Sequence, residues 1–353
     1  MGISFILSER VKDIMHVTPE GSMKLYGEMV ENQKYEITPV KLRRKSSYRK
    51  DGKSHLAIVC CNDRKTGIVE AIRILGGIDV LVRGVEGKIV IKPNCNTDDP
   101  FPRDTHPETI RVIASLLLQS GVKPDQIVVG DMSGRARGLP TRTTIQNLGI
   151  KKVAEELGLG LAYFDEESWV KITPKEATYW PHGLVIPKRI YEADRIILTP
   201  ILRSHRTATF TCAMKLGVGL IDATSREWLH DGRDHHGKLV DINCAFGVDL
   251  VISDAMKINT GEEMDSQDEV KPGIIIASDN AATNDAAAVA LMRYYKTNSV
   301  VDKPTLQHEQ FKHAERLRLG STHLKDMVVG TLNIGDNKAF PEILQYIKDE
   351  LRN

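Results

Sequence analysis

A histidine and a lysine ten residues apart are the residues of this sequence whose types and setting best suit chemistry. The segment RSHRTATFTCAMKLGVG, residues 203–219, carries His205 and Lys215 among Thr, Ala, Gly and short apolar residues. A neutral imidazole can move a proton or bind a metal ion, and a buried lysine near other cations can act as a base or nucleophile. We therefore predict that His205 and Lys215 are catalytic and that His205 is a candidate metal ligand. A histidine bonded to a backbone carbonyl and a snorkelling surface lysine are the alternatives.

Cationic residues surround this histidine. Arg203 and Arg206 flank it, and a guanidinium group grips a carboxylate or phosphate in a bidentate manner. The apolar run 207–221 is predicted to be a close-packed helix, which separates His205 and Lys215 by about 15 Å along its axis. The two side chains meet only if the segment instead doubles back at a Gly- and Thr-rich turn.

Polar loops follow three further predicted strands. Their sequences are KPNCNTDDPFPRDTHPE, GDMSGRARG and SDNAATND. Ligands of open parallel sheets bind beyond the carboxyl ends of the strands, so we predict one shared cleft for a small anionic ligand. The predicted substrate-binding residues are Lys92, Asn94, His106, Asp131, Ser133, Arg203, Ser204 and Arg206. Loops without a ligand have a similar composition, and His106 can instead cap the helix that begins at Pro107.

The cofactor is left unknown by the sequence, with a metal ion as one option. HDGRDHHG, residues 230–237, combines three histidines with two aspartates, although its composition also suits a turn. Cys95, Cys212 and Cys244 lack the close spacing of a ferredoxin-type iron–sulfur motif. GDMSGRARG is neither a P-loop nor GxGxxG, yet its glycines with Arg135 and Arg137 could cradle an anion.

The elements that must position these residues alternate between apolar strands and amphipathic helices from His55 onward. This order predicts the α/β class, with a parallel Rossmann-like sheet flanked by helices and two lobes with a cleft. We predict an N-terminal extension over 1–55, a main α/β lobe over 56–235 and a second α/β lobe over 236–353. The extension ends in the basic stretch KLRRKSSYRKDGKSH, residues 41–55, which is either a solvated linker or a phosphate-gripping arm.

Composition narrows the functional class. The chain has 353 residues and a net charge of +1, from 48 basic and 47 acidic residues. No overall charge attracts nucleic acid or an anionic membrane surface, so we expect neither partner. The five cysteines include no CxxC pair, and the apolar stretch near the amino terminus is too short to span a membrane. These features favour a cytoplasmic protein and leave a homo-oligomer open.

Five motifs in order resemble the domain of unknown function 362 family. They are VIKPN at 90–94, THPE at 105–108, GDMSG at 130–134, PILRSH at 200–205 and SDNAATNDAAAVALM at 278–292. The resemblance covers about residues 56–335. The family has no generally assigned activity, and the ferredoxin-like module that many members carry has no counterpart here.

A more distant resemblance is to the lactate racemase family. The segment EADRIILTPILRSHRTATFTCAMK, residues 192–215, has a similar spacing of histidine and lysine. The resemblance implies that His205 and Lys215 reach a common cleft, and in that family the lysine tethers a nickel-pincer cofactor. His230, His235 and His236 are the candidates for a second downstream ligand, and Ala213 and Met214 replace the family's usual Gly-Gly.

Together these features predict an enzyme that acts on a small carboxylate or phosphate. Proton or hydride transfer at a carbon next to a carboxylate is the expected racemase- or oxidoreductase-like reaction. A non-catalytic metal- or anion-binding protein is the alternative. A nucleic-acid contact through RRKSSYRK is a third, weaker interpretation.

Overall fold

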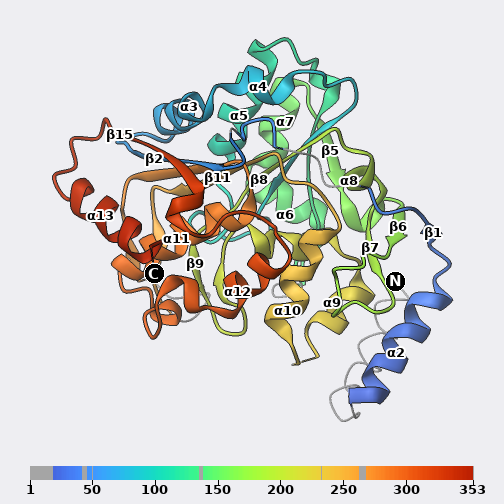
Figure 1. The fold of residues 1–353 in the computed structure, drawn as a ribbon. Coiled ribbons are helices and arrows are strands. Elements are labelled where there is room, and N and C mark those ends of the chain that lie inside the picture. The colour runs from blue at the N-terminus through green and yellow to red at the C-terminus, as the bar shows by residue number, and fades with distance from the viewer. Residues whose placement is uncertain are drawn as a thin grey trace.

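A large sheet between two layers of helices forms the centre of the protein (Figure 1). The computed structural model describes residues 19–41, 46–49, 51–134, 138–231, 233–261 and 268–352. Within them, eight strands pair in the order β15-β2-β14-β11-β8-β3-β4-β5. The strands are β2 (Ser54–Cys60), β3 (Ile89–Pro93), β4 (Ile127–Asp131), β5 (Gly160–Tyr163), β8 (Arg195–Thr199), β11 (Leu250–Ala255), β14 (Ile274–Ser278) and β15 (Met327–Asn333). The predicted α/β class with a mostly parallel sheet is confirmed.

One strand of this sheet runs against all the others. β14 pairs antiparallel with both β2 and β11, whereas the other neighbouring strands pair in parallel. The register places Ser278, the last residue of β14, opposite Leu56 and Val251 near the starts of their strands. The chain after β14 therefore emerges at the amino-terminal edge of the parallel strands.

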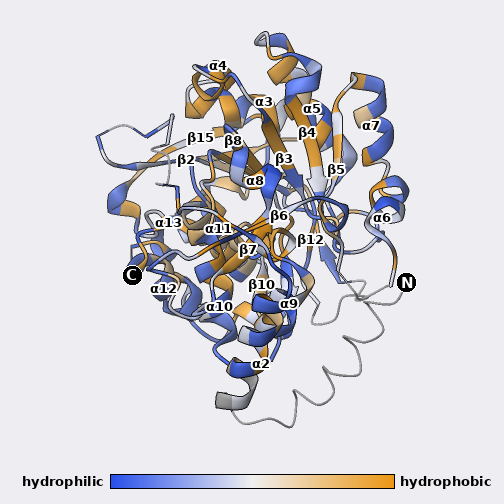
Figure 2. Cartoon of the chain, turned by 90° about the vertical axis from the view of Figure 1, so that its right-hand side faces the viewer, coloured by the Kyte–Doolittle hydropathy of each residue, from blue (hydrophilic) through white to orange (hydrophobic). Residues whose placement is uncertain are grey.

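The two faces of the sheet bury two apolar cores, because successive strand residues point to opposite faces. In β2, Leu56 and Ile58 belong to one core and Ala57 and Val59 to the other. Figure 2 shows these apolar strands at the centre of the molecule. Burial on both faces explains why the sequence of each strand is a continuous apolar run.

Helices cover both faces. Residues of α3 (Arg64–Leu75), α4 (Ile78–Val82), α5 (Pro107–Gln119), α6 (Thr141–Asn147) and α7 (Ile150–Leu157) join one core. Residues of α2 (Pro19–Asn32), α8 (Lys188–Glu192), α9 (Ala223–Leu229), α10 (His235–Asp241), α11 (Ala281–Tyr294), α12 (Glu309–Arg316) and α13 (Phe340–Glu350) join the other. A 3₁₀ helix, η3 (Met214–Leu220), belongs to the second layer.

Two smaller sheets complete the described fold. One has the order β10-β9-β12-β13 and contains β9 (Arg203–His205), β10 (Thr209–Thr211), β12 (Ile258–Asn259) and β13 (Glu269–Val270). The other has the order β1-β6-β7 and contains β1 (Glu36–Ile37), β6 (Trp169–Ile172) and β7 (Leu184–Pro187). Because β9 and β12 closely follow β8 and β11, the first small sheet continues the chain beyond the carboxyl ends of those strands.

The segments on either side of the predicted domain boundaries pack together. Within the predicted extension, Tyr26 of α2 stacks on Trp228 of α9 with ring centroids 5.1 Å apart, and β1 pairs with β6. In the large sheet, β2 lies between β15 and β14 of the predicted second lobe, and β11 of that lobe pairs with β8 of the main lobe. The division into two lobes stays a prediction, and the sheet itself is shared by both parts.

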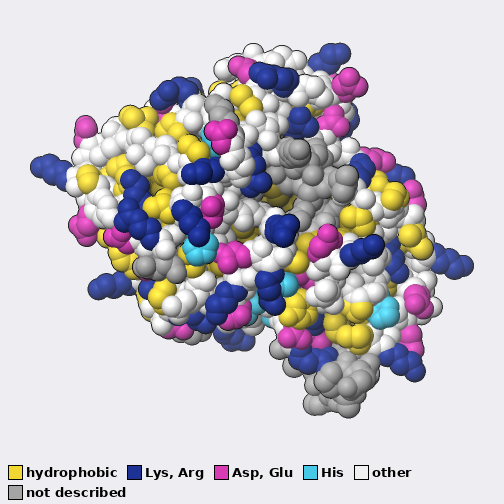
Figure 3. Space-filling model, in the orientation of Figure 1, with side chains coloured by type: hydrophobic (Ala, Val, Ile, Leu, Met, Phe, Trp, Pro, Cys, Tyr) yellow, Lys and Arg dark blue, Asp and Glu magenta, His cyan; other side chains and the backbone are white. Residues whose placement is uncertain are grey.

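The described surface is mixed in charge. Lys and Arg side chains are interspersed with Asp and Glu over the face in Figure 3, in keeping with the net charge of +1. Among the described residues, no helix combines the length and the apolar character that crossing a membrane requires.

Candidate active site

Several of the predicted site residues lie at a reversal in the strand order. The chain moves outward from β3 through β4 to β5 and then returns to β8 on the other side of β3. At such a switch point the connections diverge and leave a crevice at the carboxyl ends of the strands. Asn94, Asp131 and Arg203 all lie at this edge, because they end or follow β3, β4 and β8.

A buried ion pair forms the floor of this edge. Lys92 Nζ lies 2.6 Å from Asp131 Oδ1, and it also donates to the carbonyl of Pro93. The second oxygen of Asp131 accepts the backbone N–H of Cys95 at 2.7 Å. These bonds tie the ends of β3 and β4 together, so Lys92 and Asp131 hold the shape of the site.

The loop after β3 is organised around a second buried carboxylate, Asp104. Its oxygens accept the Asn94 side-chain amide at 2.7 Å, the Asn96 backbone N–H at 2.8 Å and the Thr97 hydroxyl at 2.6 Å. Burial raises the pKa of Asp104 to about 8, although these hydrogen bonds and the charge of Arg203 oppose the rise. Asn94 is therefore engaged inside the loop.

The segment that carries His205 and Lys215 is a hairpin followed by a 3₁₀ helix, so the predicted helix over 207–221 is wrong. β9 and β10 pair antiparallel with His205 opposite Thr209, and η3 begins only at Met214. Thr, Ala and Phe at this spacing fit either a short strand or a small-residue helix, and pairing with β12 selects the strand. The chain thus doubles back between the two candidate catalytic residues.

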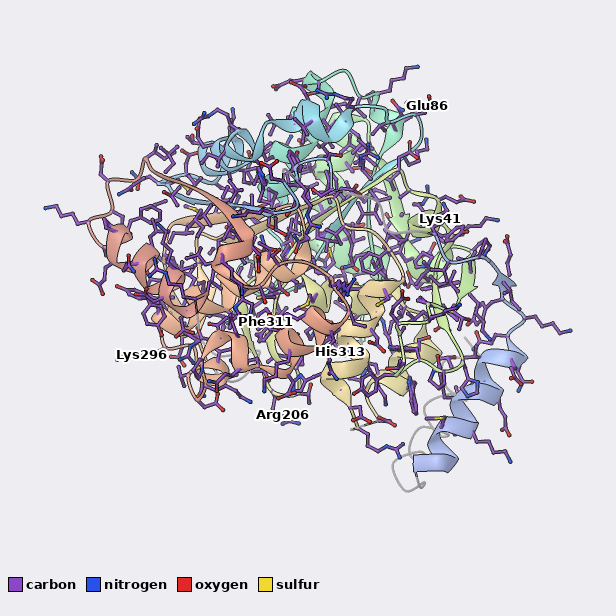
Figure 4. The ribbon with its side chains drawn as sticks, in the orientation of Figure 1. Lys41, Glu86, Arg206, Lys296, Phe311 and His313 are labelled. Atoms are coloured by element: carbon purple, nitrogen blue, oxygen red, sulfur yellow. The ribbon has the colours of Figure 1, made fainter. Side chains whose placement is uncertain are left out.

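Alternation along β9 separates its three residues. Arg203 and His205 lie on one face, and Ser204 lies on the other, where its hydroxyl donates to the carbonyl of Gly261. Arg206, in the turn, is exposed and points outward from the molecule (Figure 4). The structure brings Arg203 to His205 and places Ser204 and Arg206 elsewhere.

Hydrogen bonding fixes the tautomer of His205. Its Nδ1 accepts the backbone N–H of Ala208 at 3.0 Å and that of Thr207 at 3.3 Å. Burial lowers the pKa of His205 far below its usual range, and the charges of Lys215 and Arg203 lower it further. The neutral ring then carries its proton on Nε2 and presents an N–H donor. A ring in this state does not offer Nε2 to a metal ion.

Lys215 sits in a group of cations. Burial, together with the positive charges of Arg203, Arg226 and Lys92, lowers the pKa of Lys215 to about 7, while Asp104 opposes the change. Near neutral pH, a substantial fraction of this amine is therefore uncharged and able to accept a proton.

Two residues that the sequence analysis did not select hold this segment in place. Asp285 of α11 accepts the backbone N–H groups of Ala213 at 2.6 Å and Met214 at 2.8 Å, at the start of η3. Arg226 of α9 donates to the carbonyls of Ser133 at 2.6 Å and Met132 at 2.8 Å, and also to Val218. Asp285 lies in the selected motif SDNAATND. The polar pair of Asn284 and Asp285 inside an Ala-rich helix could have indicated that it has a buried partner. Arg226 had no such signal.

Two other predicted residues have local contacts. His106 caps α5, because its Nδ1 accepts the backbone N–H of Glu108 at 3.1 Å, and burial lowers its pKa. Ser133 is buried, and its Oγ has no hydrogen-bond partner among the described residues. Arg135 and Arg137 lie outside the described residues.

The loop SDNAATND does not lie at the carboxyl-terminal edge of the parallel strands, which corrects the prediction of four loops at one edge. Because β14 is antiparallel, residues 278–280 lie at the opposite edge of the sheet. The apolar run of β14 is the same whether the strand runs up or down, so the sequence could not reveal its direction.

The predicted metal ligands do not form a complete set. His230 and His235 each turn Nδ1 to a backbone carbonyl, of Arg226 at 2.7 Å and of Leu229 at 3.0 Å, and their ring centroids lie 5.5 Å apart. Burial lowers the pKa of His235 to about 4. In the described part of the chain, no three His, Cys, Asp or Glu side chains are placed to hold a metal ion. With the His205 tautomer, this donor set does not fit a bound metal, and we derive no step through one.

The described fold and site define an α/β protein with a cationic, partly buried cluster at the switch point of its sheet. The model of the family called domain of unknown function 362 matches residues 89–290. This is more than half of the chain, and the protein belongs to that family.

Other proteins are similar over long stretches. A thylakoid-associated protein of Synechocystis sp. is 25% identical over 291 residues, which are 77% of this chain and 82% of that protein. The lactate racemase apoprotein from Thermoanaerobacterium thermosaccharolyticum is a structural neighbour with a TM-score of 0.42 and 12% identity, covering 90% of this chain and 91% of that one. A Thermotoga maritima protein has a TM-score of 0.39 and 14% identity, and the match spans 60% of this chain and 54% of that protein.

Proposed function

We propose that the protein is an enzyme that transfers a proton at the carbon next to the carboxylate of a small organic acid. The observation that carries this proposal is the hairpin that turns the chain back between His205 and Lys215. After this turn, the Lys215 amine, with a pKa of about 7, and the neutral His205 imidazole both interact electrostatically with each other and with Arg203.

Each of the three side chains suits one part of this reaction. The guanidinium of Arg203 binds the substrate carboxylate. The neutral amine of Lys215 removes the proton from the adjacent carbon, and the electron pair of the broken C–H bond moves onto the carboxylate. The Nε2–H of His205 donates to the oxygen on which this negative charge develops. Return of the proton from the Lys215 ammonium to the same carbon completes the exchange.

The reaction is tested by following deuterium exchange. Small 2-hydroxy acids are incubated with the protein in D₂O, and loss of the proton on the carbon next to the carboxylate is measured by ¹H NMR. We expect exchange with wild-type protein and a loss of about 100-fold or more in Lys215→Met, because general-base catalysis contributes on the order of 10²–10⁴. Equal exchange in wild-type protein and Lys215→Met would contradict the proposal.

Two arginines of one hairpin provide a matched control. Arg203→Met is expected to weaken substrate binding, whereas Arg206→Met is expected to change little because Arg206 is exposed. Equal losses in both variants would favour the two-arginine clamp of the sequence analysis over a role for Arg203 alone.

The non-catalytic alternative predicts a different result. An anion-binding or metal-binding protein would retain a ligand without exchanging its protons, and elemental analysis of the purified protein would reveal a bound metal. Hydride transfer at the same carbon would require an electron acceptor in addition to these residues. We place the reaction in the cytoplasm, supported by five cysteines that are all free thiols.

A further inference from the structure

We propose that a second cavity, at the opposite edge of the sheet, binds a small organic anion that also carries hydroxyl groups. The cavity has a volume of about 570 Å³. Its lining comes from Ser46, Arg49 and Gly52 of the basic stretch, from the start of α11, from the loop after α12, and from Asn243 and residues 246–248. This site is separate from the proposed active site, because Asp279 in its wall bonds to the start of β2 rather than to the carboxyl edge.

Positive charge favours an anion at the mouth of the cavity. Arg49 and Arg318 both line it and are exposed, so their guanidinium groups are accessible to a ligand. α11 spans Ala281–Tyr294, and its first residue also lines the cavity. The amino-terminal end of a helix carries a partial positive charge that adds to that of the two arginines.

Two buried acceptors in the wall identify the rest of the ligand. Asp279 is 1% exposed, and its Oδ1 accepts the His55 backbone N–H at 3.1 Å, while its Oδ2 has no partner among the described residues. Asn243 is 5% exposed and spends its amide N–H groups on backbone carbonyls, which leaves its Oδ1 without a donor. Buried acceptors without donors are costly, and ligand hydroxyl groups supply the missing donors.

A close approach of two loops builds the wall. Gly320 lies two residues after Arg318. A Cβ added at Gly320 would overlap the Oδ1 atom of Asn280, and Asn280 is the residue that caps the start of α11. Next to this wall, a hydroxyl–hydroxyl bond of 3.2 Å from Ser54 to Ser321 ties the loop after α12 to the start of β2. The loop after α12 is thus held against the start of α11, and the arginine it carries is kept at the cavity.

The basic stretch now has a structural role. Ser46 and Arg49 from this stretch line the cavity, and Arg49 Nη2 donates to Ser54 Oγ at 3.0 Å. The sequence analysis left a solvated linker and a phosphate-gripping arm open for these residues. The cavity supports the second interpretation.

Binding is tested on the full chain by isothermal titration calorimetry with three probes. Ribose 5-phosphate carries both the anionic group and the hydroxyls, and gluconate carries a carboxylate with hydroxyls. Inorganic phosphate carries the charge alone. We expect at least one of the two hydroxylated anions to bind more tightly than inorganic phosphate, and the tighter one identifies the anionic group. Failure of both to bind at millimolar concentration, or binding no tighter than that of phosphate, would overturn the proposal.

Matched variants locate the site. Arg318→Met and Asp279→Asn are expected to weaken binding by about tenfold or more, as removal of one charged hydrogen-bonding partner does. Arg316→Met is the control, because Arg316 is exposed on the same helix end and does not line the cavity. Equal affinities in Arg318→Met and Arg316→Met would refute this location.

Arg203→Met separates this site from the active site, because Arg203 is the residue proposed to bind the substrate carboxylate. The variant is expected to retain binding of the probe to the second cavity while losing affinity for the acid substrate. Loss of probe binding in Arg203→Met would show that the probe occupies the proposed active site, and it would refute the second site without affecting the first proposal.

Discussion

Lys92 Nζ lies 2.6 Å from Asp131 Oδ1, and both side chains are almost completely buried. Gly219 of η3 packs directly on this pair, because a Cβ at Gly219 would overlap Asp131 Oδ1 and lie 2.7 Å from Lys92 Nζ. The segment that carries Lys215 is therefore seated on the ion pair that joins β3 to β4.

Gly219→Ala is expected to destabilise the protein by about 1–3 kcal/mol, the usual effect of forcing an extra methyl group into a packed interior. Urea unfolding measures the change. Val218→Ala, at the neighbouring position, removes atoms instead of adding them and is expected to cost less. An unchanged urea midpoint in Gly219→Ala would contradict the close contact.

Lys215 is expected to react with acylating reagents at neutral pH. Because its pKa is lowered to about 7, its reactive neutral amine becomes abundant as the pH rises through 7 and levels off above about 8. An ordinary lysine, with a pKa of about 10.4, continues to gain reactivity well beyond that range. Mass spectrometry of peptides after brief acetylation gives both profiles from one sample. A Lys215 profile that follows the surface lysines would refute the lowered pKa.

His205 is expected to stay neutral from pH 5 to pH 8 with its proton on Nε2. Burial and the nearby cations disfavour the charged ring, and two backbone N–H groups face Nδ1. NMR of protein with ¹⁵N-labelled histidine reports the protonation of each ring nitrogen, and His205→Asn identifies the signal by its loss. Titration with a midpoint near 6.5, or a protonated Nδ1, would rule out this tautomer.

Asp285 is expected to make stability depend on pH. Burial raises its pKa to about 7, so the folded state binds a proton more tightly than the unfolded state does. This contribution is complete below about pH 4 and is lost as the pH rises to 7, with a size on the order of a few kcal/mol. Burial also raises the pKa of Asp104 to about 8, so this carboxyl group lowers the free energy of unfolding in the same direction as the pH rises to 8.

Asp285→Asn tests that dependence by urea unfolding between pH 4 and pH 8. The variant cannot titrate and loses one of the two backbone N–H bonds, so it is expected to be less stable than wild type at pH 5. The difference should shrink as the pH approaches 7. Asp326→Asn, at an exposed position, controls for removal of a carboxylate. A difference that stays constant with pH would exclude Asp285 as the titrating group.

The strands and most helices could be predicted from the sequence because their signals are local. Apolar runs such as RIILTP mark buried strands, and a cap with Pro107 marks the start of α5. The direction of β14 could not be predicted, since an apolar run has the same composition in either direction. The hairpin of β9 and β10 depends on pairing with β12, more than fifty residues further along the chain.

The candidate site was predicted in part. Arg203, His205 and Lys215 were selected by residue type, and the structure places them in one neighbourhood. Asp285 and Arg226 act through backbone groups of distant segments, and such partners leave no spacing signature in a sequence. The roles of the selected residues stay predictions until the variants are measured.

Met214 lies between the proposed active site and the second cavity. It lines the second cavity, its N–H donates to Asp285, and the next residue is Lys215. If an occupant of the cavity shifts Met214, and this shift moves Lys215 in the crevice, then it changes the affinity of the crevice for its acid by some factor. Thermodynamic reciprocity then requires the acid to change the affinity for that occupant by the same factor. Met214 would thus couple ligand binding at the two edges of the sheet.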